Sequence, residues 1–544
     1  MDPSCSGPMK GRPFLAVVLA LALLASGLGL GGWALVLRRS PLALQHQALA
    51  LPRAARFVPS QAPLSLFLGV DGEQPVAYAR AVAPTRARRQ AADAVERLRD
   101  GAFAAAGLNY RDELASWLAP GLALALFDGG APATEAAPGG WLLALSSRDD
   151  AGARRFLQRF WQTRSLAGTD LQVSSYRGMG LISGRGALVG SEPVPLATAL
   201  VDDDLVLIAS GRGVLEQALD VSQIDELNLA GQPRLQQGLA SLGEGVGVLL
   251  ARPAALQPWL GLAPAGPLLA ALRPEGRTLV LDGFLELAEP LALAAADPLA
   301  QRALLEGLAG QPQSLAFVQD PAAVLAQPWL APLLRRAVLP SDPGGPLPDL
   351  VAAADGGPLV AALGPQGWQY GTPADQPAPQ ALEAALAAEG LIAAPLELGE
   401  RTALVWTRLS AADGRPGRRS GAGADGGADQ LQASLAGWRS APAAEAWWGS
   451  SLALLEARPA GAGAVAALLR RLEALQAPQA PLRWALASAP SRELLRPWRP
   501  WRLLTALAGG GPEPPVRGLA LAVEPEGSAL RLRARLDLGA ATDG

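Results

Sequence analysis

The chain has 544 residues, of which 50% are hydrophobic and 17% are charged, and its formal net charge is −3. This length exceeds what one compact core accommodates, so we expect at least two folding units. The apolar content excludes a highly charged disordered chain. Acidic and basic residues are interspersed without a dominant basic block, so we expect no nucleic-acid partner.

The first expected element is a membrane anchor over residues 14–37, after an N-terminal tail over residues 1–13. These 24 residues carry no charged side chain, and a helix needs about 20 apolar residues to cross a bilayer. A cleaved signal peptide has a shorter apolar segment and a clear cleavage site, whereas the "ASG" at residues 25–27 is a weak one. We therefore predict a retained single-pass helix whose partner is the lipid bilayer, and not a cleaved signal or a buried soluble helix.

The charges on either side of this segment bear on its orientation. Lys10 and Arg12 precede it, and Arg38 and Arg39 follow it. The positive-inside count alone favours a cytoplasmic body, but a short basic tail before an uncleaved span is typical of a signal anchor, and large domains translocate largely regardless of charge. We expect a linker over residues 38–57 and an extracytoplasmic body, in the periplasm or the thylakoid lumen.

The body contains two stretches that resemble each other at both ends. "APLSLFLGVD" from residue 62 aligns with "QPQSLAFVQD" from residue 311, at an offset of 249. "LRPEGRTLVLDGFLEL" from residue 272 aligns with "VEPEGSALRLRARLDL" from residue 523, at an offset of 251. We predict two related repeats, over residues 58–290 and 311–538. The alternative is that a biased composition makes Leu- and Ala-rich strings look alike.

Between these ends the offset changes. It falls to 227 at Gly140 and Trp141 against residues 367–368, and it returns to 247 where "DLVLIAS" from residue 204 resembles "SLALLEA" from residue 451. A Gly-rich, apolar-poor insertion at residues 411–430 accounts for the regained length, and we expect it to be a flexible loop.

Each repeat is predicted to be α+β. Short or alternating apolar runs such as "LSLFLGV", "GLALALFD", "WLLALSS", "DLVLIAS" and "TLVLDGFLEL" are typical of strands, and the last two runs of the chain, joined by Pro-Glu-Gly, predict a hairpin. Helices are expected over residues 85–107 and over "RDDAGARRFLQRFWQ", which begins with Asp149 and Asp150 near its N-terminus. Strands joined partly by hairpins and partly by helices indicate largely antiparallel sheets with helices.

Rare residues limit the chemistry of the chain. Cys5 and His46 are its single cysteine and histidine. No disulfide can therefore form within the chain, and zinc sites of the usual type lack ligands. A Ser-His-Asp or Cys-His triad would depend on His46. Paired carboxylates remain as possible acids and bases, but no pair is singled out. We expect no catalytic residue, no cofactor and no metal ion.

Two local motifs invite a functional interpretation that a structural one outweighs. Asn109 and Tyr110 are rare residue types here, but Asn suits a left-handed turn after a helix, Asp112 suits a cap, and Trp117 suits the core. The three aspartates at residues 202–204 offer oxygen ligands for calcium, but their spacing is not that of a calcium loop. We expect turns at both places.

The segment "RPWRPWR" at residues 496–502 is the most unusual local pattern, and we expect it to be extended. Its Trp498, Trp501, Arg499 and Arg502 are candidates for contact with lipid headgroups or an anionic partner. The alternative is a loop whose tryptophans pack inward while the arginines stay in water.

The segments "FVPSQAPLSLFLGVD", "NYRDELASWLAPGLALAL" and "GWLLALSSRDDAGARRFLQRF", together with the expected anchor, resemble the domain of unknown function 3352 family of bacterial, notably cyanobacterial, membrane-anchored proteins. The resemblance extends over residues 56–538. It implies an envelope or thylakoid setting and a body of α+β repeats, and it carries over no catalytic or ligand residue.

These observations favour a non-enzymatic, membrane-tethered binding or scaffolding protein whose partner is another envelope protein or a lipid. A carrier of an apolar ligand is the first alternative and needs a sizeable pocket. A carboxylate-dependent hydrolase is the second and needs two acids that converge in a cleft.

Overall fold

The computed structural model describes residues 40–127, 139–165, 171–187, 193–257, 266–340, 346–353, 357–376, 379–398, 401–411, 431–442, 444–457, 464–509 and 516–539. The expected tail and anchor over residues 1–37, and all but the first residue of the loop expected at residues 411–430, lie outside these ranges. Within the described ranges, no helix has both the length and the apolar character that a membrane span requires.

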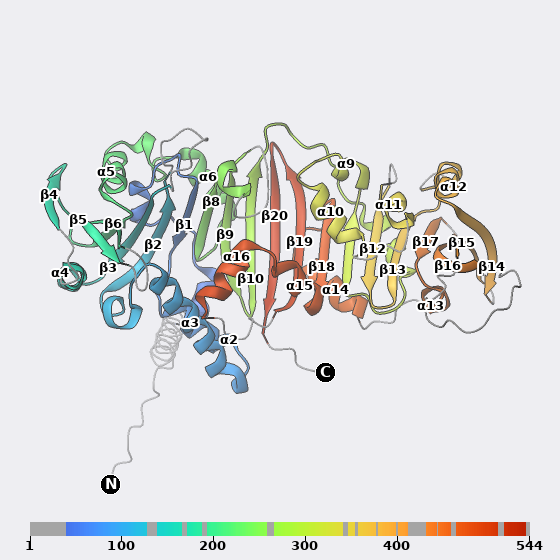
Figure 1. Ribbon diagram of the computed structural model, residues 1–544, viewed down its shortest axis with the longest axis horizontal. Helices are drawn as coiled ribbons and strands as arrows, with labels where there is room; N and C mark the ends of the chain where they lie inside the picture. Colours follow the sequence, from blue (N-terminus) through green and yellow to red (C-terminus); the bar gives the residue numbers. More distant parts are fainter. Residues whose placement is uncertain are drawn as a thin grey trace, which may run out of the picture.

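The described strands form one long sheet in which neighbouring strands are antiparallel (Figure 1). The first ten strands are β1 (Leu64–Leu68), β2 (Leu118–Leu126), β3 (Trp141–Ser147), β4 (Gln172–Tyr176), β5 (Met179–Ala187), β6 (Pro193–Val201), β7 (Leu205–Ala209), β8 (Gly247–Ala251), β9 (Leu268–Glu275) and β10 (Thr278–Glu286). The next ten are β11 (Ser314–Val318), β12 (Leu359–Gly364), β13 (Gly367–Pro373), β14 (Leu391–Leu398), β15 (Arg401–Ala411), β16 (Leu431–Ser440), β17 (Glu445–Gly449), β18 (Leu482–Ala487), β19 (Val516–Glu526) and β20 (Ala529–Leu538).

Helices cover parts of both faces of this sheet. In the first half they are η1 (Pro41–His46), η2 (Arg53–Phe57), α2 (Gln74–Val82), η3 (Thr85–Ala87), α3 (Arg88–Ala105), η4 (Tyr110–Leu114), α4 (Asp150–Ser165), α5 (Arg212–Val221), η5 (Asp225–Leu227), α6 (Pro233–Leu242) and α7 (Pro253–Ala255). In the second half they are α8 (Pro298–Glu306), α9 (Pro321–Leu325), α10 (Ala331–Val338), α11 (Leu347–Ala352), α12 (Pro379–Ala388), α13 (Leu452–Glu456), α14 (Ala464–Ala474), α15 (Ser488–Leu495) and α16 (Arg499–Leu507).

The two halves of the sheet have the same strand order. From the centre outward, the first half runs β10, β9, β8, β1, β2, β3, β7, β6, β5, β4, and the second runs β20, β19, β18, β11, β12, β13, β17, β16, β15, β14. The halves join through β10 and β20, which pair from Thr278 opposite Asp537 to Glu286 opposite Ala529. The expected α+β class with a largely antiparallel sheet is therefore confirmed, and so is the hairpin of β19 and β20.

One expected alignment between the halves is wrong. "DLVLIAS" corresponds to strand β7, whereas "SLALLEA" forms the helix α13. The strand that occupies the position of β7 in the second half is β17, just before α13. The two strings are alike because both are rich in Leu and Ala, and such short runs do not by themselves distinguish strand from helix.

The offset of 249 at the first strand needs a one-residue correction. The continuous register from β1 to β11 places Phe67 and Phe317 on the same face of the sheet. Their residue numbers differ by 250. In both β1 and β11 the odd-numbered residues lie on the same face, so an offset of 249 would place equivalent residues of these two strands on opposite faces. Asp71 and Asp320, which each accept a hydrogen bond from the backbone N–H three residues on, keep the offset of 249. The chain after β11 is therefore one residue shorter than the chain after β1.

We call the side of the sheet that bears Leu66 the first face, and the side that bears Phe67 the second face. The second face of the first half is covered by η2, α5 and α6, which form one hydrophobic core with it. On the first face, α4 and η4 cover the outer strands β3 and β7, and α9, α10 and α11 cover the strands of the second half. The strands whose first face is covered by neither group of helices therefore lie between these two cores.

Candidate binding surface on the first half of the sheet

A group of leucines on the first face lies between the two cores of that face. Register places them side by side, because Leu66 is opposite both Leu124 and Leu249, and Leu68 is opposite Leu122. Leu124 is 38% exposed, and the others are partly exposed. We call this set the leucine face, and its members are Leu64, Leu66, Leu68, Leu122, Leu124, Leu126, Leu249 and Leu272.

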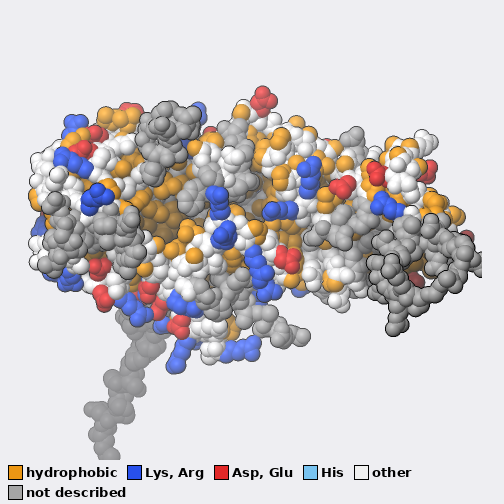
Figure 2. All heavy atoms as spheres, viewed as in Figure 1, with side chains coloured by type: hydrophobic (Ala, Val, Ile, Leu, Met, Phe, Trp, Pro, Cys, Tyr) orange, Lys and Arg blue, Asp and Glu red, His pale blue; other side chains and the backbone are white. Residues whose placement is uncertain are grey.

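Figure 2 shows hydrophobic side chains gathered in a hollow over the strands that Figure 1 labels β1 and β2. Five members of the leucine face, Leu66, Leu68, Leu124, Leu126 and Leu272, belong to none of the described hydrophobic cores. Contiguous exposed apolar surface of this kind marks interaction sites more often than scattered single residues do.

The second half provides an internal comparison, because its equivalent strands are fully covered. On its first face Ala316, Ala361 and Trp484 occupy one row across β12, β11 and β18, and each is at most 4% exposed. Leu334 of α10, itself 0% exposed, packs in the same core. Two of these three positions are alanine, which lets the helices approach closely, whereas the equivalent row of the first half carries leucines and no described helix lies over them.

The helices that follow β1 are held away from the leucine face by their own contacts. The hydroxyl of Tyr78 on α2 donates to the carbonyl oxygen of Gly276 at the β9–β10 turn, at 2.9 Å. Gly101 of α3 lies against α16 so closely that a Cβ there would be 1.7 Å from the carbonyl oxygen of Leu507. The α2–α3 hairpin therefore packs against the turn at the ends of the central strands β9 and β10 and against α16 of the second half, and not over β1 and β2.

The sequence carries a signal for this surface in two neighbouring strands and not in any single motif. Leucines alternate at residues 64, 66 and 68 of β1 and again at residues 122, 124 and 126 of β2. The residues between them include Phe67, Ala123 and Ala125, which are buried on the second face. Both faces are thus apolar, which is typical of a strand covered on both sides, but the described helices cover the second face and leave this part of the first face open.

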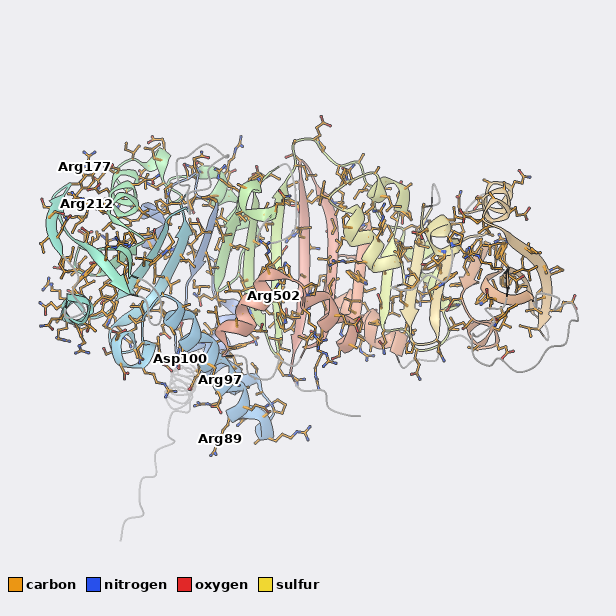
Figure 3. The ribbon with its side chains drawn as sticks, viewed as in Figure 1. Arg89, Arg97, Asp100, Arg177, Arg212 and Arg502 are labelled. Carbon is orange, nitrogen blue, oxygen red and sulfur yellow. The ribbon has the colours of Figure 1, made fainter. Side chains whose placement is uncertain are left out.

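The motif at residues 496–502 is partly helical, which corrects the expected extended conformation. Pro500 lies in the first turn of α16, where proline is tolerated because its missing N–H has no partner in the helix. Trp501 is buried beside Leu495 and Val516, whereas Trp498 is 38% exposed. Arg499 and Arg502 are exposed, and Figure 3 shows Arg502 on α16. The four residues do not form one surface, and their contact with lipid stays a prediction.

The three aspartates at residues 202–204 form the turn between β6 and β7, as expected. Asp202 and Asp203 have positive φ angles of 48° and 65°. Arg53 binds Asp202 and donates two hydrogen bonds to Asp204, at 2.7 and 2.9 Å, and Arg154 pairs with Asp203. Arginines thus occupy the positions where calcium would bind, and no group of metal-ligating side chains occurs among the described residues.

Asn109 and Tyr110 have structural roles. Asn109, not Asp112, is the cap of η4, and its side-chain oxygen accepts a hydrogen bond from the Asp112 N–H at 3.2 Å. Tyr110 is 3% exposed, with the Arg99 guanidinium 4.0 Å from its ring centroid. Burial, reinforced by the charge of Glu73, raises the pKa of Tyr110 to about 12. Trp117, 1% exposed, is in the core as predicted.

All four tyrosines of the chain have a raised pKa, which predicts a delayed alkaline titration. Burial is the main cause for Tyr78, Tyr110 and Tyr370, and a hydrogen bond to Asp220 is the main cause for Tyr176. Each folded pKa exceeds the unfolded value of about 10, so this stabilisation is complete below pH 10 and is lost as the pH rises through the folded pKa, which for Tyr110 is about 12. Absorbance at 295 nm should therefore change at higher pH in the native chain than in urea. Coincident curves would contradict the assignment.

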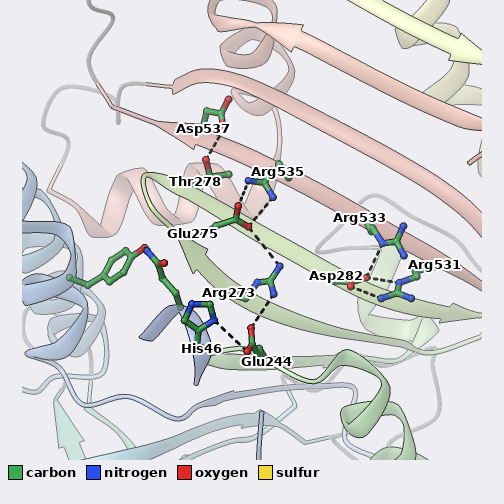
Figure 4. Close-up of polar contacts among 12 residues, drawn as sticks. His46, Glu244, Arg273, Glu275, Thr278, Asp282, Arg531, Arg533, Arg535 and Asp537 are labelled. Atoms are coloured by element: carbon green, nitrogen blue, oxygen red, sulfur yellow. Dashed lines mark hydrogen bonds and ion pairs between the residues drawn. The ribbon is translucent and has the colours of Figure 1, made fainter. Parts of the chain in front are cut away.

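Charged residues of the second face form a seam where the two halves meet (Figure 4). Arg531 donates two hydrogen bonds to Asp282, at 3.0 and 2.8 Å, and Arg535 donates two to Glu275, at 3.0 and 2.9 Å. The Arg535 hydrogen bond is the main reason that the pKa of Glu275 is lowered. The carboxylates of the seam are therefore paired with arginines across the β9, β10 and β20 strands, which is an arrangement that joins the halves.

His46 lies at the edge of this seam. Its Nδ1 is 3.4 Å from an oxygen of Glu244, and its side chain is 78% exposed. Glu244 also lies 3.4 Å from Arg273. The imidazole thus faces an ion pair at the surface, and this position provides no buried base for a nucleophile.

Together the fold and this surface define an α+β protein with one long antiparallel sheet and an uncovered apolar face. Residues 17–282, slightly less than half of the chain, match the family described as "Protein of unknown function (DUF3352)". The expected resemblance is thus confirmed over residues 17–282. The match does not include the second half, to which the expectation also extended.

The chain was also compared with curated proteins and with solved structures. No curated protein matches it. Crystal form III of TP0453 is 13% identical, with 47% of this chain and 87% of that chain covered at a TM-score of 0.26. Crystal form IV is 13% identical, with 45% and 83% covered at a TM-score of 0.25. Crystal form I is 12% identical, with 44% and 80% covered at a TM-score of 0.24. These scores are too low for the likeness to inform the fold or the function.

Proposed function

We propose that the protein is a membrane-tethered, non-enzymatic binding module whose leucine face takes an apolar surface of a partner in the bacterial envelope or thylakoid. The observation that carries this proposal is the difference between the halves. The helices α9, α10 and α11 cover the first face of the second half. The equivalent strands of the first half bear partly exposed leucines there. Full burial of an exposed leucine contributes about 1.5–3 kcal/mol. The leucines of this face are already partly buried, so each contributes only part of this, and an occupant gains affinity from several of them together.

The shape of the surface favours a scaffolding role over that of a carrier. The leucine face is an open sheet surface, which suits a helix or an apolar protein patch. Two cavities among the described residues, of about 210 and 290 Å³, are at or below the lower end of the range of about 300–1,000 Å³ usual for small-molecule sites. A carrier of an apolar ligand or lipid is the second candidate, because the same leucines would also accept an acyl chain.

The absence of a catalytic role is part of the proposal and is supported by the pairing of acids. In the described seam Asp282, Glu275 and Glu524 each face an arginine. A carboxylate held as an anion by a guanidinium is a poor general acid. The alternative of a carboxylate-dependent hydrolase receives no support from these contacts.

We further propose that the halves derive from one duplicated unit, and that the body is held outside the cytoplasm by residues 14–37. The shared strand order supports the duplication, and so does the hydrogen bond that Asp71 and Asp320 each accept from the backbone N–H three residues on. The 24 uncharged residues support the tether.

Site-specific photo-crosslinking in cells tests the binding role. A photoreactive amino acid replaces Leu124 in the full chain, and the control position is Leu299 of α8, which is 79% exposed and lies outside the leucine face. We expect adducts of defined mass at Leu124 and not at Leu299, and we expect Leu66→Arg to remove them because it places a charge opposite Leu124. A protein adduct supports the scaffold and a lipid adduct the carrier. The proposal fails if Leu124 gives no adduct or gives the same adducts as Leu299.

A further inference from the structure

The α2–α3 hairpin carries a group of arginines at the end that projects furthest from the sheet (Figure 1). We call this group the arginine tip, and it consists of Arg80, Arg86, Arg88 and Arg89, all of which are exposed. Residues 74–92 contain no aspartate or glutamate. Figure 3 shows Arg89 and Arg97 on α3, beyond the ends of the strands.

The charges of the arginine tip are not neutralised by the rest of the described chain. None of its four guanidinium groups makes an ion pair with a described residue. Nearer the body the same hairpin behaves differently, because Arg99 pairs with Glu73 and Asp100, at 2.8 Å each. The positive charge is thus concentrated at the tip, in a protein whose formal net charge is −3.

The arginine tip is also close to the point where the described chain begins. Gln45 of η1 donates a hydrogen bond from Nε2 to the Tyr78 hydroxyl of α2, at 2.9 Å. Four residue steps separate Leu37, the last residue of the uncharged segment, from Pro41 at the start of η1. Four steps of extended chain span at most about 14 Å. If residues 14–37 are in the bilayer, η1 and the hairpin that packs on it lie at the membrane surface.

We propose that the arginine tip binds the anionic headgroups of the membrane that holds residues 14–37, and so fixes the orientation of the body on that membrane. This proposal rests on the tether in the proposed function. Basic side chains attract anionic lipids only within about a Debye length, which is about 8 Å at physiological salt, and the short connection to η1 keeps the hairpin in range. A fixed orientation would in turn present the leucine face at a constant angle to the bilayer.

The test uses the full chain in vesicles of phosphatidylcholine with and without phosphatidylglycerol. Cys5 is replaced by Ser, and the exposed Gln90 beside the tip is replaced by Cys and labelled with a fluorophore. Quenching by headgroup-labelled lipid then reports the distance of the tip from the surface, while flotation of the same vesicles reports the tether. We expect strong quenching only with the anionic lipid, and its loss near 1 M salt, where the Debye length is about 3 Å.

Matched variants assign the effect to the tip. The variant R80Q/R86Q/R88Q/R89Q should remove the dependence on anionic lipid, because each arginine near the surface changes binding about fivefold. The control R234Q/R302Q/R335Q/R336Q removes four exposed arginines elsewhere and should behave as the unaltered chain does. Equal quenching in both lipids, or an unchanged tip variant, overturns the proposal while flotation still succeeds. Failure of flotation in phosphatidylcholine overturns the tether instead.

Discussion

Leu334→Ala should lower the free energy of unfolding by about 2–5 kcal/mol, whereas Leu124→Ala should lower it by about 1 kcal/mol or less. Leu334 on α10 is 0% exposed in the core that covers the second half of the sheet. Its removal leaves a cavity that the neighbouring side chains fill only in part, which adds to the lost transfer free energy.

Leu124→Ala is the matched control because it removes the same atoms from a side chain of the leucine face. Its side chain is 38% exposed and belongs to none of the described cores, so truncation leaves an open surface and not a cavity. Urea unfolding followed by tryptophan fluorescence measures both variants. Equal destabilisation would mean that the leucine face is covered in the native protein, and that it is not available to a partner.

Trp501→Ala should destabilise the protein by about 3–5 kcal/mol, which is the usual cost of truncating a buried aromatic residue. Trp501 is 7% exposed and packs with Leu495 and Val516 in the small core where α15 and α16 meet β19 and β20. Loss of this core should loosen α16, which α3 contacts at Gly101.

Trp498→Ala is the companion change and should leave the free energy of unfolding within about 1 kcal/mol, since its side chain is 38% exposed. Trp498 is therefore the variant that tests lipid contact by the motif, in the labelled vesicle assay with the full chain. Changing both tryptophans together would combine a binding effect with a folding defect. Similar unfolding midpoints for the two single variants would contradict the assignment of Trp501 to the core.

Several elements were predictable because their signals are local. The helix ending before Gly107, the helix beginning at Asp150 and the hairpin at residues 527–528 each depend on caps, charges or turn residues close in sequence. The error in the alignment, which matched strand β7 with helix α13 and not with strand β17, arises because these runs lack such local signals. Leu- and Ala-rich runs of five to seven residues carry too little period to distinguish the two.

The candidate site was harder to predict than the fold. Trp498 and Trp501 drew attention because of their pattern, but Pro500 begins a helix there and turns Trp501 inward. The leucines at residues 64, 66 and 68 resemble an ordinary buried strand, because both faces of β1 are apolar. Nothing in the strand itself indicates that one face has no cover.

The sequence by itself determined the shortage of catalytic side chains, the uncharged N-terminal segment, the α+β class and the similarity of the ends of the two halves. These follow from composition, period and local turn chemistry. Only the tertiary structure decided that β10 pairs with β20 to make one sheet, that arginines neutralise the acids of residues 202–204, and that the α2–α3 hairpin leaves the leucine face open. Each of these depends on contacts between residues far apart in the chain, and such contacts leave no local pattern.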